Sequence, residues 1–132
     1  MSESILVVDD EPMARTLLRL MLVRAGFEVI EAEDGYDALE KLKKDPPDAM
    51  ILDVMMPGID GFYVCEAVRG NSDLSGLPII MLSAKTDTDS VNRGLSVGAN
   101  RYLTKPISPE ELTRQVRDVL NSGDESESPE AE

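Results

Sequence analysis

Three aspartates follow two short apolar runs and form the most chemically informative feature of the chain. Asp9 and Asp10 come directly after residues 5–8, and Asp53 ends residues 49–53. If these runs are neighbouring strands of a parallel sheet, the three carboxylates meet at one edge. Two unit charges about 4 Å apart repel by roughly 4 kcal/mol at an effective dielectric near 20, so the cluster needs a cation or must take up protons. An all-oxygen site of this kind favours Mg²⁺, or Mn²⁺ in its place.

Further polar side chains end the later apolar runs. Ser83 supplies a hydroxyl after residues 78–82, and Lys105 follows residues 101–104 and precedes Pro106, an X-Pro bond that can also be cis. Beside a metal, such a lysine is useful only if an anion arrives, and phosphoryl oxygens are the obvious candidate. Tyr102 lies three residues before Lys105 on the same run.

Each of these residues also has an ordinary structural interpretation. Asp10 alternatively caps the first helix, and Asp53 opens a turn. Lys105 is alternatively a surface lysine, Ser83 a turn or cap serine, and Tyr102 a core tyrosine. The segment Met55 to Gly61, rich in proline and glycine, is either an ordinary loop or one whose backbone reaches the metal and the phosphate. Together, the set indicates phosphoryl transfer to a carboxylate, with Asp53 as the best acceptor.

The amino-acid composition of the chain argues against several classes of function. The 132 residues carry 26 acidic and 13 basic side chains, a formal charge of −13, which argues against direct binding of nucleic acid or an anionic membrane. With no histidine, the chain cannot supply its own phosphohistidine, so another molecule must donate the phosphoryl group. The single cysteine, Cys65, fits a reducing compartment, and no targeting or membrane-spanning segment is visible. We therefore expect a cytoplasmic protein.

Five apolar runs alternate with helical patterns, which predicts an α/β fold with a parallel sheet covered on both faces. Three runs are continuously apolar, as in strands buried on both sides, whereas the second and fifth look nearer an edge. The five predicted strands are ILVV (5–8), FEVIEA (27–32), AMILD (49–53), PIIMLS (78–83) and RYLT (101–104).

The intervening segments carry helix signals. Met13, Leu17, Leu18, Leu20, Met21 and Leu22 form a broad apolar stripe opposite Arg15, Arg19 and Arg24, with Gly26 as the C-terminal cap. Further helices are predicted around 38–44, 61–68 and 89–97. The last helix starts at Ser108 with a capping box closed by Glu111 and runs to about Leu120. One domain over residues 1–120 is expected, followed by an acidic disordered tail or linker over 121–132.

Residues 3–120 resemble a known family, the receiver domains of two-component response regulators. The resemblance implies the flavodoxin-like, doubly wound sheet with strand order 2-1-3-4-5. The motifs occur in the family's order and at its usual spacing: ILVVDDEP (5–12), ILDVMMPGIDG (51–61), PIIMLSAK (78–85), GANRYLTKP (98–106) and SPEEL (108–112).

The resemblance also assigns roles. It makes Asp53 the phosphoacceptor, assigns the metal to Asp9, Asp10, Asp53 and the backbone carbonyl of Met55, and makes Ser83 and Lys105 the phosphate-binding residues. Ser83 and Tyr102 form the switch that alters the surface of the fourth helix, fifth strand and fifth helix. Met55 and Lys85 fall where the family tunes self-dephosphorylation.

The implied partners are a sensor histidine kinase or phosphotransfer protein and a downstream output protein or domain. A phosphorylation-dependent dimer through the switched surface is left open. The chain is expected to be no enzyme beyond its own phosphorylation and dephosphorylation. Three alternatives remain at this stage: a receiver-like module that is never phosphorylated, a phosphatase of the haloacid dehalogenase type, and a nucleotide- or flavin-binding module. The last is disfavoured because three acids stand where a phosphate-binding loop is needed.

Overall fold

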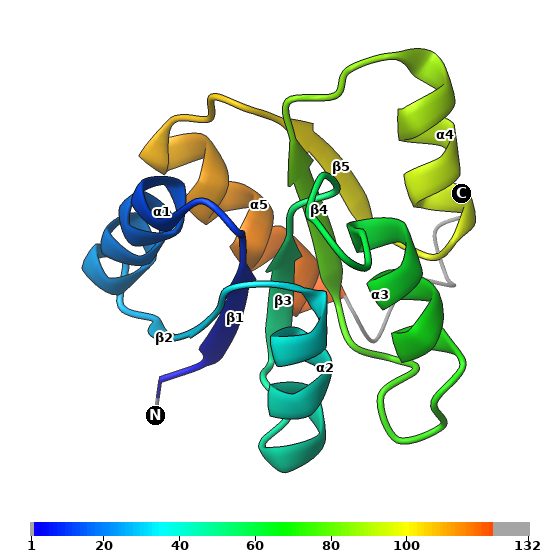
Figure 1. Ribbon diagram of the computed structural model, residues 1–132. Helices are drawn as coiled ribbons and strands as arrows, with labels where there is room; N and C mark the ends of the chain where they lie inside the picture. Colours follow the sequence, from blue (N-terminus) through cyan, green and yellow to red (C-terminus); the bar gives the residue numbers. More distant parts are fainter. Residues whose placement is uncertain (1, 123–132) are drawn as a thin grey trace.

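The computed structural model describes residues 2–122, in which five strands and five helices alternate along the chain (Figure 1). The strands are β1 (Ser4–Val8), β2 (Glu28–Ala32), β3 (Ala49–Leu52), β4 (Ile79–Ser83) and β5 (Arg101–Thr104). The helices are α1 (Pro12–Arg24), α2 (Gly35–Lys44), α3 (Gly61–Arg69), α4 (Thr88–Ser96) and α5 (Pro109–Ser122).

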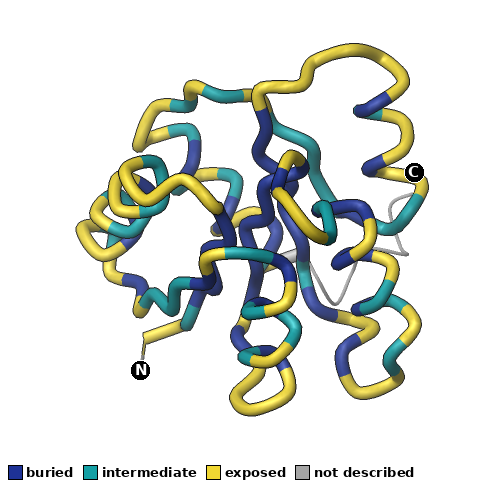
Figure 2. The backbone as a smooth tube through the Cα atoms, in the orientation of Figure 1, coloured by how far each residue is buried: buried dark blue, intermediate teal, exposed yellow. Residues whose placement is uncertain are grey.

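All strands pair in parallel, in the order β2-β1-β3-β4-β5, which confirms the predicted fold. β2 and β5 lie at the edges, as their patterns indicate. The residues of β1, β3 and β4 alternate between two cores, because successive side chains of a strand point to opposite faces. Ile5 and Val7 pack with α1 and α5, whereas Leu6 and Val8 pack with α2 and α3. The buried strands therefore form the centre of the molecule (Figure 2).

The predicted apolar stripe of α1 is only partly buried. Leu18 and Leu22 are buried, but Met13, Leu17 and Leu20 are exposed to 78%, 54% and 51%. A helix on one face of a sheet buries only one stripe, and these three side chains lie beside it. The surface of α1 thus presents large apolar groups to solvent.

Helix ends mostly follow the predicted signals. Gly26 adopts a φ of 100°, a conformation that favours glycine, and α2 ends before Pro46. At α5 the Glu111 amide donates to Ser108 Oγ at 3.1 Å, but the Glu111 carboxylate accepts from Arg114 and Gln115 instead of completing a capping box.

The C-terminal end of the predicted domain and the predicted tail lie at or beyond the limit of the described residues. α5 continues to Ser122, two residues beyond the predicted boundary, and residues 123–132 of the predicted tail lie outside the described residues. Within residues 2–122, no helix has the length and apolar character needed to cross a bilayer.

Candidate functional site

The carboxyl ends of β1 and β3 bring the three predicted aspartates together. The Asp53 amide donates to the Val8 carbonyl at 3.0 Å, which aligns the two strand ends. One carboxylate oxygen from each of Asp9, Asp10 and Asp53 lies within 4.8 Å of the others. Asp9 and Asp53 are buried, whereas Asp10 is exposed. The cluster therefore has one open side and two carboxylates held away from water.

Asp10 is not the cap of α1, as its alternative interpretation supposed. Glu11 takes that position, since its carboxylate accepts from the Ala14 amide at 2.8 Å. The Glu11 amide in turn donates to Asp9 Oδ1 at 2.9 Å. Asp10 is thereby left with its carboxylate among the other acids rather than on the helix.

Lys105 reaches this cluster from the end of β5, where the Lys105–Pro106 peptide bond is cis. Its Nζ lies 2.8 Å from Asp9 Oδ2 and 3.6 Å from Asp53 Oδ2. Burial alone would lower the pKa of Lys105, but the hydrogen bond to Asp9 and the charge of Asp53 outweigh it, and the pKa is raised. Lys105 is therefore a cation at neutral pH, aimed at two carboxylates.

Asp53 is held in an electrostatically unfavourable position. Burial raises its pKa, Lys105 opposes that effect, and the charges of Asp9 and Asp10 add to it. The Met55 amide also donates to Asp53 Oδ1 at 3.3 Å, the turn contact foreseen as an alternative. One lysine faces three acids, so the site as a whole retains an excess of negative charge.

This donor set fits a divalent cation. Carboxylate oxygens on two adjacent strand ends, partly exposed on one side, leave room for the waters that Mg²⁺ keeps. The ligand role of the Met55 carbonyl stays a prediction. The residues present are therefore compatible with the cation that the sequence analysis expects.

Ser83 and Tyr102 are joined through the backbone of Lys85. Ser83 is fully buried, and its Oγ accepts from the Lys85 amide at 3.1 Å. The Tyr102 hydroxyl donates to the Lys85 carbonyl at 2.7 Å, and burial raises the pKa of that hydroxyl. Tyr102 is thus neither a free surface residue nor a fully buried core tyrosine.

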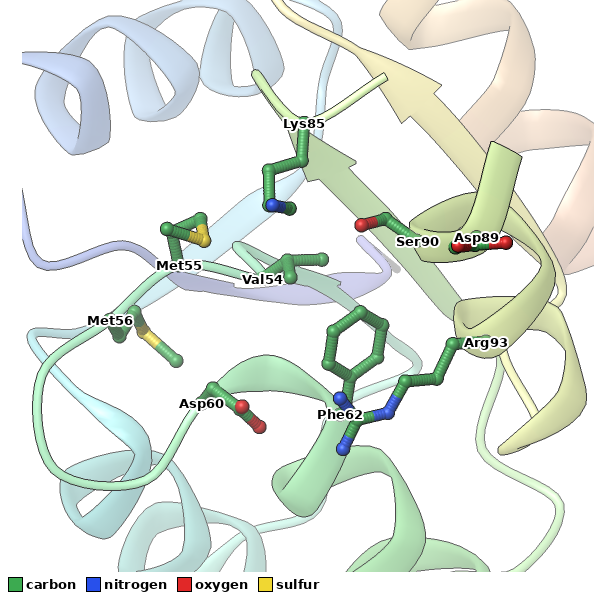
Figure 3. A pocket seen from close by; sticks show the side chains of 9 residues that line it. All are labelled: Val54, Met55, Met56, Asp60, Phe62, Lys85, Asp89, Ser90 and Arg93. Atoms are coloured by element: carbon green, nitrogen blue, oxygen red, sulfur yellow. The ribbon is translucent and has the colours of Figure 1, made fainter. Parts of the chain in front are cut away.

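A groove opens beside the acids, between the β3–α3 connection and α4 (Figure 3). It has a volume of about 430 Å³, and Arg93 lies over the Phe62 ring with 4.3 Å between the guanidinium carbon and the ring centroid. Met55 and Lys85, the two positions singled out by the resemblance, both line it. The lining residues are Val54, Met55, Met56, Asp60, Phe62, Lys85, Asp89, Ser90 and Arg93.

One residue that contacts the cluster, Arg15, is not predicted from the sequence. Arg15 was placed on the polar side of α1, yet its Nη1 donates to the Asp9 carbonyl at 2.7 Å. Its position one turn into the helix that follows β1 is the signal that it can reach back to the end of that strand.

Comparison with known proteins places these features in a family. Residues 5–117 match the model of the response regulator receiver domain. The alkaline phosphatase synthesis transcriptional regulatory protein PhoP of Bacillus subtilis is 44% identical over 120 residues, which are 91% of this chain and 49% of that protein. The probable transcriptional regulator ycf27 of Porphyridium aerugineum is 44% identical over 126 residues, 96% of this chain and 51% of that protein. The chain thus spans about half the length of these relatives.

Solved structures also include chains with the same fold and a similar sequence. The chemotaxis protein CheY4 of Vibrio cholerae superimposes with a TM-score of 0.86 at 38% identity, covering 90% of this chain and 99% of that one.

Proposed function

Because the chain belongs to the family of response regulator receiver domains of two-component systems, we propose that Asp53 accepts a phosphoryl group from a partner's phosphohistidine. The observation that carries the proposal is the placement of Lys105 Nζ between Asp9 and Asp53, at 2.8 and 3.6 Å. A phosphoryl group on Asp53 would add anionic oxygens where a fixed cation already stands. Family membership also disfavours the phosphatase and the nucleotide- or flavin-binding alternatives.

The transfer needs an ionised, correctly oriented carboxylate. An oxygen of Asp53 attacks phosphorus, the phosphorus–nitrogen bond of the phosphohistidine breaks, and its electron pair stays on the donor imidazole. Burial makes the Asp53 carboxylate a stronger base, and Lys105 helps keep it ionised. The Met55 amide fixes its other oxygen. The chain thus acts only on itself, in its own phosphorylation and dephosphorylation.

Asp9, Asp10, Asp53 and the Met55 carbonyl are the proposed ligands of Mg²⁺ or Mn²⁺. When bound, such a cation supplies positive charge that offsets the charge on the phosphoryl oxygens. Lys105 and Ser83 contribute from this chain: Lys105 pairs with a phosphoryl oxygen, and Ser83 donates a hydrogen bond. Ser83 Oγ accepts from the Lys85 amide through a lone pair, and the hydroxyl proton can rotate toward a phosphoryl oxygen.

Signal output is proposed to pass from Ser83 to Tyr102 through Lys85. Movement of the Ser83 hydroxyl toward a phosphate would pull on the Lys85 amide, and the carbonyl of the same residue holds Tyr102. The Tyr102 ring also packs against Gly94 of α4. A change at Ser83 is thereby coupled to the α4–β5–α5 surface, the proposed face for an output partner or a phosphorylation-dependent dimer.

The exposed apolar side chains of α1 are the proposed docking surface for the phosphodonor protein. Leu17 lines a cavity of about 350 Å³ together with Lys105 and Pro106, so this surface is continuous with the mouth of the acidic site. A partner that packs on Met13, Leu17 and Leu20 would deliver its phosphohistidine beside Asp53. Exposed apolar patches of this kind commonly mark protein interfaces.

Two of the relatives are transcriptional regulators by name, and the chain matches about half of each. We therefore propose that the phosphorylated surface is read by a separate output segment or protein. The acidic composition of the chain opposes direct contact with nucleic acid.

The test is phosphorylation by acetyl phosphate in the presence of Mg²⁺, followed by intact-protein mass spectrometry. One added phosphoryl group is expected on the wild-type chain and none on Asp53→Asn. Asp60→Asn is the matched control, because Asp60 caps α3 beside the site without joining the acid cluster. Absence of an adduct on the wild type, or an adduct that persists in Asp53→Asn, would refute the proposal and favour a receiver-like module that is never phosphorylated.

A further inference from the structure

Arg15 links the end of β1 to the edge strand β2. Its Nη1 donates to the Asp9 carbonyl at 2.7 Å, and its Nε lies 3.0 Å from Glu31 Oε1. The Arg15 side chain is only 17% exposed. One planar guanidinium therefore joins a backbone oxygen at the acidic site to a carboxylate on the neighbouring strand.

Glu31 is itself held from two helices. Arg19, one turn farther along α1, lies 3.0 Å from Glu31 Oε2, and Lys41 of α2 donates to the Glu31 carbonyl. The Lys41 contact holds the Glu31 backbone independently of Arg19, so Glu31 offers Arg15 a support that remains when Arg19 is removed. The Arg15 guanidinium is thereby oriented before any ligand arrives.

The carbonyl that Arg15 contacts belongs to the peptide unit joining Asp9 to Asp10. The other polar atoms of Asp9 are also engaged: its amide donates to the Ala32 carbonyl at 3.2 Å, and its carboxylate accepts from the Glu11 amide and Lys105. Rotation of the Asp9–Asp10 peptide plane would move the directions of both carboxylates. Arg15 restrains that rotation from outside the pocket.

We propose that Arg15, supported by Glu31, is a positioning residue for the divalent-cation site formed by Asp9, Asp10 and Asp53. This inference rests on the proposed function. Arg15 itself contacts neither the cation nor the phosphoryl group. Its effect is to fix the backbone between two of the three acidic ligands, so that the carboxylates converge without rearrangement.

Removal of Arg15 has two opposite effects on the affinity for the cation, and they can be measured separately. Loss of a positive charge near three carboxylates strengthens cation binding, whereas loss of the orienting hydrogen bond weakens it. Arg19→Ala likewise removes one positive charge and one contact to Glu31, but it leaves the Arg15–Asp9 and Lys41–Glu31 hydrogen bonds in place. The pair of variants therefore separates charge from position.

The experiment is calorimetric titration of each protein with Mg²⁺ alone. Arg15→Ala is expected to bind on the order of tenfold more weakly than wild type, the lower end of effects for groups that orient metal ligands. Arg19→Ala is expected to bind at least as tightly as wild type, and Arg15→Lys to fall between. In the metal-free proteins, the NMR signal of the Glu11 amide, which reports on Asp9 Oδ1, should shift in Arg15→Ala but not in Arg19→Ala.

Circular dichroism melting of both variants verifies that they are folded. If Arg15→Ala binds Mg²⁺ as tightly as wild type or more tightly, or if Arg19→Ala loses as much affinity, the role of Arg15 is refuted. A wild-type chain that is phosphorylated on Asp53 while both variants bind Mg²⁺ alike would refute this inference alone. A wild-type chain that neither binds Mg²⁺ nor accepts a phosphoryl group would refute the proposed function as well.

Discussion

Lys105 Nζ donates to Asp9 Oδ2 at 2.8 Å, although the two residues lie at opposite ends of a row of four strand ends, β5, β4, β3 and β1. Asp9 is 1% exposed at its side chain, whereas Lys105 is 27% exposed. The contact therefore neutralises a carboxylate that water cannot reach. It also holds the lysine over Asp53, the proposed acceptor.

Replacement of Lys105 by methionine should impair both stability and phosphorylation. The variant leaves Asp9 buried without its cationic partner, and we expect a loss of about 1–3 kcal/mol in the free energy of unfolding. Loss of a cation that faces the transferred group should slow labelling by acetyl phosphate by about 100-fold. Urea denaturation and a mass-spectrometric time course measure the two effects. Lys44→Met, at an exposed site in α2, is the control; equal rates in the two variants would contradict the role of Lys105.

The ionised Asp53 carboxylate should lower the free energy of unfolding of the metal-free protein at neutral pH. Burial raises the pKa of Asp53 in the folded protein, with Lys105 opposing and Asp9 adding to the effect. A raised folded-state pKa means that the contribution of Asp53 to stability is complete below its ordinary pKa of about 4 and is lost as the pH rises through the folded-state pKa. Metal-free Asp53→Asn should therefore unfold with a free energy roughly 1 kcal/mol higher than wild type near pH 7.

The pH dependence provides the internal control for this prediction. Urea denaturation in metal-free buffer should show the difference between Asp53→Asn and wild type shrinking as the pH falls toward about 4. Mg²⁺ should in turn raise the melting temperature of the wild type more than that of Asp53→Asn, since Asp53 is one of the proposed ligands. A variant that is less stable than wild type near neutral pH would show that the attraction to Lys105 dominates instead.

Much of the fold follows from local sequence patterns. Continuous apolar runs such as 5–8 and 79–82 are buried on both faces, and turns and helix ends occur near glycine and proline, as at Gly26 and Pro46. The site residues Asp9, Asp10 and Asp53 converge because strands that run parallel bring their carboxyl ends to one edge. The strand order itself came from the family resemblance, since the residues alone do not specify which strands are neighbours.

Features that depend on packing between elements were not predictable. Periodicity places Leu17 and Leu18 on one broad stripe, but only the orientation of α1 on the sheet determines that Leu18 is buried and Leu17 exposed. Likewise, Asp10 is the better candidate for the helix cap by residue type, yet the chain path at the end of β1 selects Glu11. The reach of Arg15 back to the Asp9 carbonyl depends on the same path.

Gly94 should control the position of the Tyr102 ring. A Cβ atom at Gly94 would lie 2.7 Å from Tyr102 Cδ2 and 2.8 Å from Met81 Sδ, closer than carbon and sulfur tolerate. Gly94→Ala is expected to cost about 1–3 kcal/mol in the free energy of unfolding and to displace the ring from its hydrogen bond with the Lys85 carbonyl. Aromatic NMR signals of Tyr102 and urea denaturation measure these changes.

A double-mutant cycle identifies the obstructing side chain. In a Tyr102→Ala background the ring is absent, so the cost of Gly94→Ala should fall by at least about 0.5 kcal/mol. If the cost is the same in both backgrounds, the contact with Met81 is responsible and Gly94 does not position Tyr102.

Arg69 should stabilise the fold without affecting the chemistry at Asp53. From the end of α3 it donates to the carbonyls of Gly98, Leu77 and Ser75 and to Asn100 Oδ1, at 2.7 to 3.0 Å. These partners directly precede β4 and β5. They therefore lie at the amino ends of these strands, whereas the acids lie at the carboxyl ends of β1 and β3. Burial lowers the pKa of Arg69, but its hydrogen bonds are those of a charged guanidinium. Arg69→Ala should therefore cost about 2–4 kcal/mol in the free energy of unfolding.

Urea denaturation of Arg69→Ala, Arg69→Lys and the exposed control Arg24→Ala tests this role. Lysine should restore little of the lost stability, because a single ammonium cannot reproduce the planar fork that serves four acceptors. Under conditions where Arg69→Ala is folded, its rate of labelling by acetyl phosphate should equal that of wild type. A slower rate in folded Arg69→Ala would show that the two ends of the sheet are coupled and that Arg69 acts on the site as well as on stability.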